Sequence, residues 1–236
     1  MIRSSLKAPQ DDRKQVARRG SGTRGAPASR TPATIDGSRA TPRQQERYQS
    51  VIDATLGRLH DVGFEATRIQ DIADLSGVAL GTIYRYFKSR DQLIYIATQR
   101  WLTETTEAAV PTGAKARGAL EPQLIQVIRR SARALIKEPR LLEAWARSSM
   151  SNDPVVVELV REHRIEDAMR MFPPGRITDG SLLNDLVLVM EHIWFAGIVR
   201  WAYGQKDYEQ VHKDVERGML MALNAHRTSP DLAPKG

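Results

Sequence analysis

Apolar residues recur every three or four positions through most of this chain, which is the spacing of helices that bury one face. The first such run opens at Thr41-Pro42, since threonine favours the N-cap and proline is tolerated at the first helical position. Gly63 is expected to end this first helix. No segment shows strand-like alternation bounded by turn residues, so the pattern predicts an all-α fold.

Two short helices are predicted close behind the first. Thr67 is expected to cap one of them, with Gln70 at the capping-box position, and Gly77 supplies a tight turn before the other, over residues 79–87. Two short helices joined by a glycine turn are typical of a helix-turn-helix that reads DNA. Six side chains are predicted to face inward: Ile69, Ile72, Ala73, Val78, Ile83 and Phe87.

A longer helix over residues 89–110, capped by Ser89, leads to a break at residues 111–113, Pro-Thr-Gly. The apolar spacing continues after the break. It predicts five more helices, over residues 120–137, 139–150, 153–172, 180–203 and 207–225.

The helix over residues 180–203 is apolar around nearly its whole circumference, so we expect it to be buried on more than one side. A partner chain is favoured over a membrane because four polar residues interrupt the run: Asn184, Asp185, Glu191 and His192. The amphipathic helix over residues 207–225 completes a two-helix surface. Two helices from each of two chains would form a four-helix bundle, so the pattern predicts a homodimer.

The net charge of +7 is concentrated at the N-terminus. Residues 1–40 hold nine basic and three acidic residues, a net +6, which leaves +1 for the rest. That segment has almost no large apolar residues, so we expect a disordered basic arm, with residues 229–236 as a tail. One interpretation is an extension without function, part of it a mis-assigned translation start. The other is an arm that contacts phosphates or the minor groove.

Several classes of protein are excluded or disfavoured. There is no cysteine, no signal peptide and no uninterrupted apolar run long enough to cross a membrane, so a cytoplasmic location is expected. No nucleophile elbow, phosphate loop or dinucleotide fingerprint is present, which indicates no enzyme and no cofactor. His163 and Asp167 have the i, i+4 spacing of metal ligands, as do Glu162 and Glu166. Salt pairing on a charged helix is the favoured interpretation, so no metal is predicted.

Residues 77–87, Gly-Val-Ala-Leu-Gly-Thr-Ile-Tyr-Arg-Tyr-Phe, resemble the Gly-Val-x-x-Gly-Thr-Leu-Tyr-x-His-Phe pattern of the TetR family of bacterial repressors. The resemblance implies a helix-turn-helix DNA-binding domain over residues 41–88 and a connecting helix over residues 89–110. It also implies a helical effector-binding and dimerisation domain over residues 111–228. A dimer of this kind binds a palindromic operator and is released by a small molecule.

The resemblance and the chemistry of the side chains give the DNA-binding candidates. Gly81 allows close approach to DNA, Thr82 and Arg85 are suited to base edges, and Ala79 and Leu80 lie at the tip of the helix.

Five further residues are expected to contact the phosphate backbone: Thr67, Arg68, Tyr84, Tyr86 and Arg90. Tyr86 stands where the family usually has histidine, and Arg90 where it usually has lysine. The alternative is that Tyr84 and Tyr86 only pack, and that Arg85 is a solvated charge.

Large, flexible apolar side chains in the second half are candidates for the lining of an effector pocket. They are Trp145, Met150, Met169, Phe172, Met190, Trp194 and Phe195. Ordinary core packing is the alternative for each. His192 is interpreted as a dimer contact or a core histidine rather than a ligand sensor.

Residues 138–147 and 193–201 resemble segments of KstR-type repressors of steroid catabolism, which implies a hydrophobic effector such as a steroid, lipid or acyl-CoA. Candidate phosphate partners for a CoA thioester are Arg140, Arg147, Arg161 and Arg164, although such charges are more often solvated. Two alternatives to a ligand-released repressor stay open. One is a ligand-independent DNA-binding protein, and the other is an activator or architectural binder that uses the basic arm.

Overall fold

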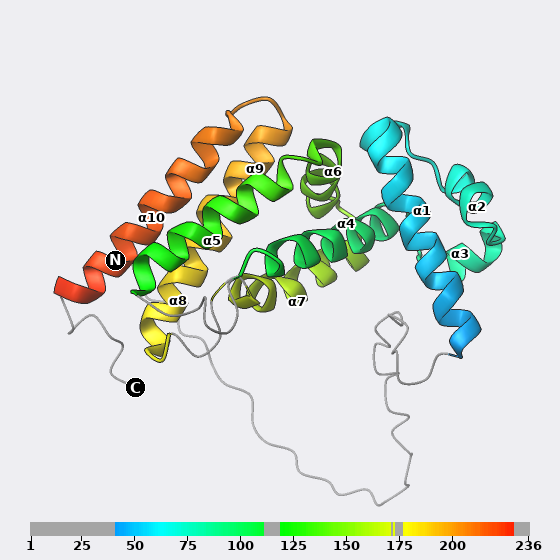
Figure 1. Ribbon diagram of the computed structural model, residues 1–236. Coiled ribbons are helices and arrows are strands. Elements are labelled where there is room, and N and C mark those ends of the chain that lie inside the picture. The colour runs from blue at the N-terminus through cyan, green and yellow to red at the C-terminus, as the bar shows by residue number, and fades with distance from the viewer. Residues whose placement is uncertain (1–40, 111–118, 171, 173–176, 229–236) are drawn as a thin grey trace, which may run out of the picture. The chain divides into compact units, whose positions relative to one another are not determined.

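Every element in the described part of the chain is a helix, so the all-α prediction is confirmed (Figure 1). The computed structural model describes residues 41–110, 119–170, 172 and 177–228, with the backbone alone for residues 164–168. Three predicted parts fall outside these residues: the basic arm (1–40), the break (111–113) and the tail (229–236).

The N-terminal domain consists of α1 (Pro42–Ala66), α2 (Ile69–Ser76) and α3 (Leu80–Tyr86). α1 begins at the predicted cap, where the Thr41 hydroxyl accepts from the backbone N–H of Gln44 and the Gln44 side chain accepts from the backbone N–H of Thr41. The six side chains predicted to face inward are all buried, and they share one core with residues of α1 and of the following helix: Val51, Ile52, Leu93 and Ala97.

Gly77 closes α2 in the left-handed conformation, with φ of 65°, as predicted for the turn of a helix-turn-helix. Gly63 also has a positive φ, of 78°, and kinks α1 near its end. One further turn follows this kink, so α1 reaches Ala66 instead of stopping at the glycine.

The prediction that Thr67 caps α2 is wrong. Arg68 occupies the N-cap position and its side chain makes no cap hydrogen bond. Thr67 is buried, and its hydroxyl donates a 2.7 Å hydrogen bond to the carbonyl of Gly63, four residues earlier. The extra turn after the kink brings Thr67 under that carbonyl, so its hydroxyl completes the end of α1 instead of opening α2.

α4 (Arg90–Glu107) belongs to both halves of the described chain. It begins at Ser89, whose hydroxyl accepts from the backbone N–H of Gln92, and packs on α1. In the C-terminal half it contacts α5 (Leu120–Leu135), α6 (Pro139–Ser149) and α7 (Pro154–Arg170). α6 also packs on α1, so two helices connect the domains.

The predicted helix over residues 180–203 has three parts: α8 (Gly180–Val189), a π-helical turn at Met190–Trp194, and α9 (Phe195–Ala202). α10 (Tyr208–Thr228) packs closely beside it. Glycines allow this approach, because a Cβ at Gly197 would lie 2.7 Å from Cγ1 of Val211, and one at Gly218 would lie 2.6 Å from Cδ1 of Ile193.

Residues Gly180–Ala202 are long and apolar enough to cross a membrane by length and composition, with a mean hydropathy of 1.6 over the most apolar window, despite the polar residues within. The inner side of this helix packs into the C-terminal core, where Leu186 and Met190 meet Met219 of α10. Asp185 also pairs with His226 at 2.8 Å. Only 28% of the window is buried, so much of the helix surface is exposed.

Candidate functional site

The helix after the Gly77 turn presents an exposed face that carries polar and aromatic groups. Tyr84 and Arg85 are exposed on α3, as are Ala79 and Gly81 at its start, while Leu80 and Thr82 are half-buried. Arg68 is also exposed at the start of α2. The structure therefore brings most of the predicted DNA-binding residues onto the accessible parts of α2 and α3.

Tyr86 differs from this group. Its ring packs against Tyr48 and Phe87, with ring centroids 6.1 and 6.4 Å away. Its hydroxyl is enclosed and has no hydrogen-bond partner in the described part of the chain. The expected phosphate contact from Tyr86 is not supported, and the packing alternative holds for this residue. Thr67 is likewise buried, with its hydroxyl occupied, and presents no side-chain group to DNA.

Arg90 holds the domain together instead of facing DNA. Its Nε donates a 2.8 Å hydrogen bond to the carbonyl of Thr67, another guanidinium nitrogen donates to the carbonyl of Phe64, and a third pairs with Asp91. The guanidinium lies 4.4 Å from the centre of the Phe64 ring. All three nitrogens are engaged, so the expected phosphate contact from Arg90 is not supported.

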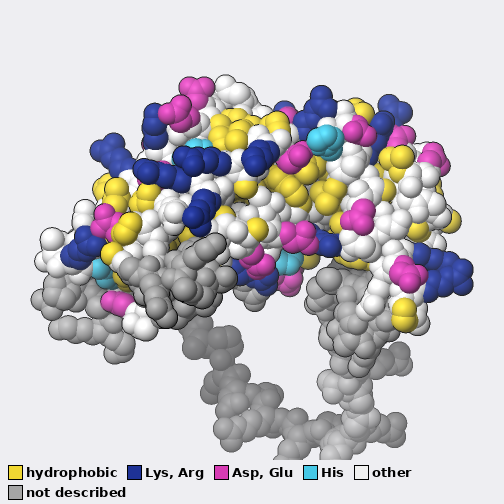
Figure 2. All heavy atoms as spheres, viewed as in Figure 1, with side chains coloured by type: hydrophobic (Ala, Val, Ile, Leu, Met, Phe, Trp, Pro, Cys, Tyr) yellow, Lys and Arg dark blue, Asp and Glu magenta, His cyan; other side chains and the backbone are white. Residues whose placement is uncertain are grey.

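One exposed basic side chain beside α3 was missed. Lys88 follows Phe87 and is exposed. The signal in the sequence was its place two residues after the Tyr-Arg-Tyr cluster. On the face drawn in Figure 2, basic and acidic side chains are interspersed over the described helices. This agrees with a net charge of only +1 outside the N-terminal 40 residues, so specific side chains, not a broad basic field, distinguish α3.

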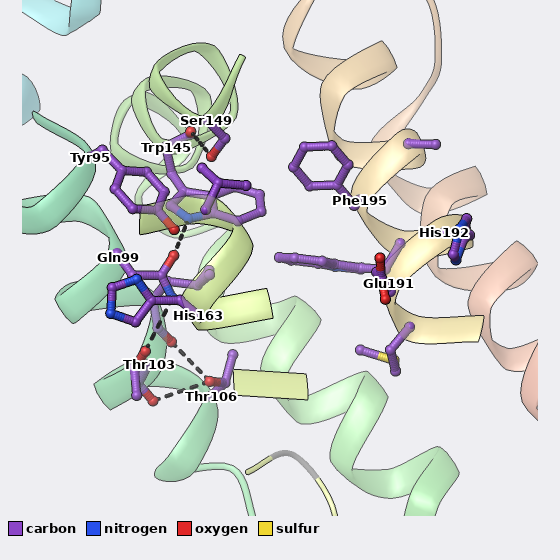
Figure 3. Close-up of a pocket in the computed structure, with 15 residues that line it drawn as sticks. Tyr95, Gln99, Thr103, Thr106, Trp145, Ser149, His163, Glu191, His192 and Phe195 are labelled. Atoms are coloured by element: carbon purple, nitrogen blue, oxygen red, sulfur yellow. Dashed lines mark hydrogen bonds between the residues drawn. The ribbon is translucent and has the colours of Figure 1, made fainter. Parts of the chain in front are cut away.

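A cavity of about 260 Å³ lies in the C-terminal half, between α4, α6 and α7 on one side and the α8–α9 segment on the other (Figure 3). Four of the seven predicted pocket residues line it: Trp145, Met190, Trp194 and Phe195. The Trp145 ring centre is 5.1 Å from that of Trp194 and 5.8 Å from that of Phe195, which makes one aromatic wall.

The other three predicted pocket residues do not line this cavity. Met150 and Met169 are exposed, and neither lines the cavity. Phe172 is buried, but in a separate core cluster with Leu186 and Met219. The apolar type of a side chain does not by itself indicate whether that side chain borders the cavity.

The α4 side of the cavity carries polar groups that the search for apolar residues missed. Helix α4 contributes Tyr95, Gln99, Thr103 and Thr106, which recur at helical spacing and form a stripe along one face. The Gln99 side chain accepts from the indole N–H of Trp145 at 2.6 Å and reaches Thr103 at 3.4 Å. The polar i, i+4 pattern within the connecting helix was the signal that could have found them.

The π-helical turn lies in the cavity wall. Four of its five residues line the cavity: Met190, Glu191, His192 and Trp194. Single π turns inside α-helices occur frequently at functional sites. His192 has its Nδ1 3.1 Å from the carbonyl oxygen of Leu188 and points away from the cavity centre in Figure 3.

Two arginines proposed for CoA phosphates are used elsewhere. Arg140 donates to the carbonyls of His60 and Asp61 at the end of α1. Arg147 pairs with Glu143 at 2.7 Å and reaches Glu65 of α1 at 3.4 Å.

The other two candidates are Arg161 and Arg164. Arg161 pairs with Glu158 on α7, and the Arg164 side chain lies outside the described part. Among the described residues no cluster of His, Asp and Glu fits a metal ion; the side chains of Glu166 and Asp167 are not part of that set.

Comparison with known families identifies the protein family that has these two sites. Residues 51–95 match the sequence model described as bacterial regulatory proteins, tetR family, and residues 118–221 match the one described as tetracyclin repressor-like, C-terminal domain. The chain belongs to the TetR family. Members are DNA-binding transcription regulators, so this TetR-family chain is a regulator and not an enzyme.

Alignments with similar proteins extend over most of the chain. The HTH-type transcriptional repressor KstR of Mycolicibacterium smegmatis is 27% identical over 76% of this chain and 88% of its own length. KstR of Rhodococcus jostii is 29% identical over 80% and 88%. The crystal structure of a TetR transcriptional regulator from Rhodococcus sp. RHA1 shares the fold, with a TM-score of 0.60, 20% identity and coverage of 77% of this chain and 97% of that one.

Proposed function

We propose that this TetR-family protein is a cytoplasmic transcriptional repressor that binds a palindromic operator as a homodimer and is released by a small hydrophobic effector. The observation that carries the proposal is the exposed Tyr84–Arg85 pair on the helix after the Gly77 turn, in a chain whose other half encloses a cavity. The relatives named as repressors support repression over activation.

Arg85 is the side chain best suited to read a base or hold a phosphate, because it is exposed and Gly81, Ala79 and Tyr84 leave the same face accessible. Thr82 supports it with a hydroxyl and a methyl group. Two copies of α3 in a dimer would read half-sites about 34–36 Å apart, or a multiple of one helical turn.

Dimerisation is supported by the outward side of the two C-terminal helices. Leu188 on α8 is 54% exposed and Met221 on α10 is 64% exposed. Val189 and Ile193 are only partly covered by the core. A second copy would cover this apolar surface with the same two helices, as the sequence predicted for residues 180–203 and 207–225.

Release by an effector is supported by the position of the cavity. Its walls include α4 and α6, and these two helices also pack on α1 of the DNA-binding domain. A ligand shifts the protein away from DNA only if it binds the free conformation better than the DNA-bound one. A molecule that separates Trp145 from Gln99 would act directly on both helices that reach α1.

The cavity volume restricts the effector. About 260 Å³ lies just below the range of ~300–1,000 Å³ typical of pockets for drug-sized ligands. A steroid or acyl group could be enclosed largely or in part, and the CoA portion of a thioester would remain outside. Arg140 and Arg147 are held by α1 and do not favour a phosphate there.

The test is capture and sequencing of genomic DNA bound by the full chain, followed by gel-shift titration of the recovered site at fixed salt. We expect one palindrome, two chains per site by sedimentation of the complex, and a loss of affinity of about 10-fold or more for Arg85→Ala with unchanged folding. Hundreds of unrelated sites, or unchanged affinity of Arg85→Ala, would refute the proposal. Hydrophobic metabolites are then screened by thermal shift, since a ligand of the folded state raises its stability.

A further inference from the structure

The wall of the cavity includes a polar atom that the fold leaves unsatisfied. Nδ1 of His163, on α7, is enclosed and has no hydrogen-bond partner in the described part of the chain. His163 lines the cavity, and its ring lies 6.3 Å from that of Tyr95, which is buried. An enclosed polar atom without a partner is destabilising, and each such atom in a native protein calls for an explanation. A ligand that supplies the missing bond is one explanation.

The surroundings of His163 limit what that ligand can be. The rings of Trp145, Trp194 and Phe195 and the side chain of Met190 also line the cavity, so most of the ligand must be apolar. Glu191 lines the same cavity, and its negative charge disfavours an anionic ligand.

Three neighbouring polar groups already have hydrogen-bond partners within the protein. The Gln99 oxygen is occupied by Trp145, and the Thr106 hydroxyl donates within its own helix to Leu102 and Thr103. The Ser149 hydroxyl donates to the Trp145 carbonyl at 2.7 Å.

From this geometry we propose that His163 selects the effector by a hydrogen bond from or to a single ketone or hydroxyl oxygen on an otherwise apolar, uncharged molecule. The imidazole nitrogen donates to a ketone when it carries the proton, and accepts from a hydroxyl in the other tautomer. The proposal rests on the proposed function, because it assigns the ligand class of the same cavity. A hydrocarbon of equal shape would leave Nδ1 unsatisfied and bind more weakly.

The probes are three molecules with one carbon skeleton: tetralin, 2-tetralone and 2-tetralol, titrated into the full chain by calorimetry. We expect the ketone and the alcohol to bind about tenfold more tightly than tetralin, because a net hydrogen bond in a protein corresponds to roughly that factor. Tetralin-2-carboxylic acid is expected to bind no better than tetralin, since its charge faces Glu191.

Three variants test whether His163 is responsible. His163→Phe keeps a ring in place but removes the nitrogen, so the preference for oxygen should fall to about one while tetralin still binds. His163→Asn places an amide near the position of Nδ1 and should restore most of the preference. His60→Phe is the control: His60 lies outside the cavity and pairs with Glu138 at 2.6 Å, so the preference should be unchanged.

The outcomes separate this proposal from the proposed function. Equal affinity for all three neutral probes, or a preference that persists in His163→Phe, overturns the role of His163 and leaves the cavity as an effector site. Tightest binding of the carboxylate overturns the uncharged class. If no probe binds the wild-type chain, the cavity fails as a site for small apolar effectors, and the role of His163 fails with it.

Discussion

The indole nitrogen of Trp145 donates a 2.6 Å hydrogen bond to the side-chain oxygen of Gln99, and both residues are buried. This bond joins α6 to α4, the two helices that reach from the cavity to α1. The bond therefore lies between the cavity and the DNA-binding domain, where a bound ligand would affect both. It also contributes to the stability of the fold.

Gln99→Leu should destabilise the protein by about 1–3 kcal/mol, because it leaves the buried indole N–H of Trp145 without an acceptor. The measurement is the free energy of unfolding from urea titration. Gln210→Leu serves as the control, since Gln210 is exposed and bonds only Asp214 one turn away, so its effect should stay within about 0.5 kcal/mol. Equal effects of the two substitutions would show that the Gln99–Trp145 bond adds nothing to stability.

Gly197→Ala and Gly57→Ala should change stability in opposite directions. A Cβ at Gly197 would lie 2.7 Å from Cγ1 of the buried, β-branched Val211, so we expect a loss of about 1–3 kcal/mol. A Cβ at Gly57, inside α1, meets nothing within 4 Å, so alanine should stabilise by about 0.4–1 kcal/mol. Thermal unfolding of both variants checks the pair, and a stabilised Gly197→Ala would contradict the close packing of α9 on α10.

Arg90→Ala and Arg85→Ala should separate a structural from a DNA-reading arginine. Arg90→Ala removes hydrogen bonds to the Thr67 and Phe64 carbonyls and the stacking on Phe64, so we expect a loss of about 1–3 kcal/mol. Arg85→Ala should leave the free energy of unfolding within about 0.5 kcal/mol. Urea titrations of both variants provide the comparison. If Arg90→Ala left stability unchanged but weakened operator binding, Arg90 would have to be counted among the residues that contact DNA.

The two arginines also show which features of the DNA-binding domain could be predicted from the sequence. The Gly77 turn, the Thr41 cap and the inward side chains of the DNA-binding domain follow from local spacing, so Gly77, Ile83 and Phe87 were predicted correctly. The role of Arg90 depends on carbonyls of Phe64 and Thr67, more than twenty residues earlier, which no local pattern reveals.

The cavity shows the same division. The apolar character of the side chains was enough to predict the aromatic wall of Trp145, Trp194 and Phe195, because large rings are rarely left on a surface. It failed for Met150, which is exposed, and it could not find His163, whose significance lies in an unsatisfied nitrogen. Which face of a helix borders a void is decided by tertiary packing.

Stability should fall when the pH is lowered from 7.5 to 5.5, in part because of His212. Burial lowers the pKa of His212 below its usual value of 6.5, and the nearby Glu216 and Glu209 only partly oppose this effect. The unfolded chain therefore takes up a proton near pH 6.5 that the folded chain still rejects, so the contribution is present above that pH and is lost below it. Unfolding free energies of the wild type and His212→Gln across this range should show a weaker pH dependence in the variant. An identical slope would exclude the contribution.

Arg140→Ala should reduce the effect of an effector on operator binding without changing its affinity for the free protein. Arg140 on α6 donates to the His60 and Asp61 carbonyls at the end of α1, and Glu138 beside it meets the His60 ring nitrogen at 2.6 Å. These bonds fix the cavity wall to the DNA-binding domain. Loosening them should lower the coupling, measured as the ratio of operator affinities with and without saturating effector, by several-fold within the usual 5–150-fold range.

The control for this prediction is Arg161→Ala, since Arg161 pairs with Glu158 on its own helix and should leave the ratio unchanged. A ratio that survives Arg140→Ala while the effector still binds would mean that α4 alone carries the signal. In that case Gln99→Leu, which cuts the link between α6 and α4, should leave the coupling intact as well, because α6 would then have no part in it. If instead both substitutions lower the ratio, the path from the cavity to α1 runs through α6.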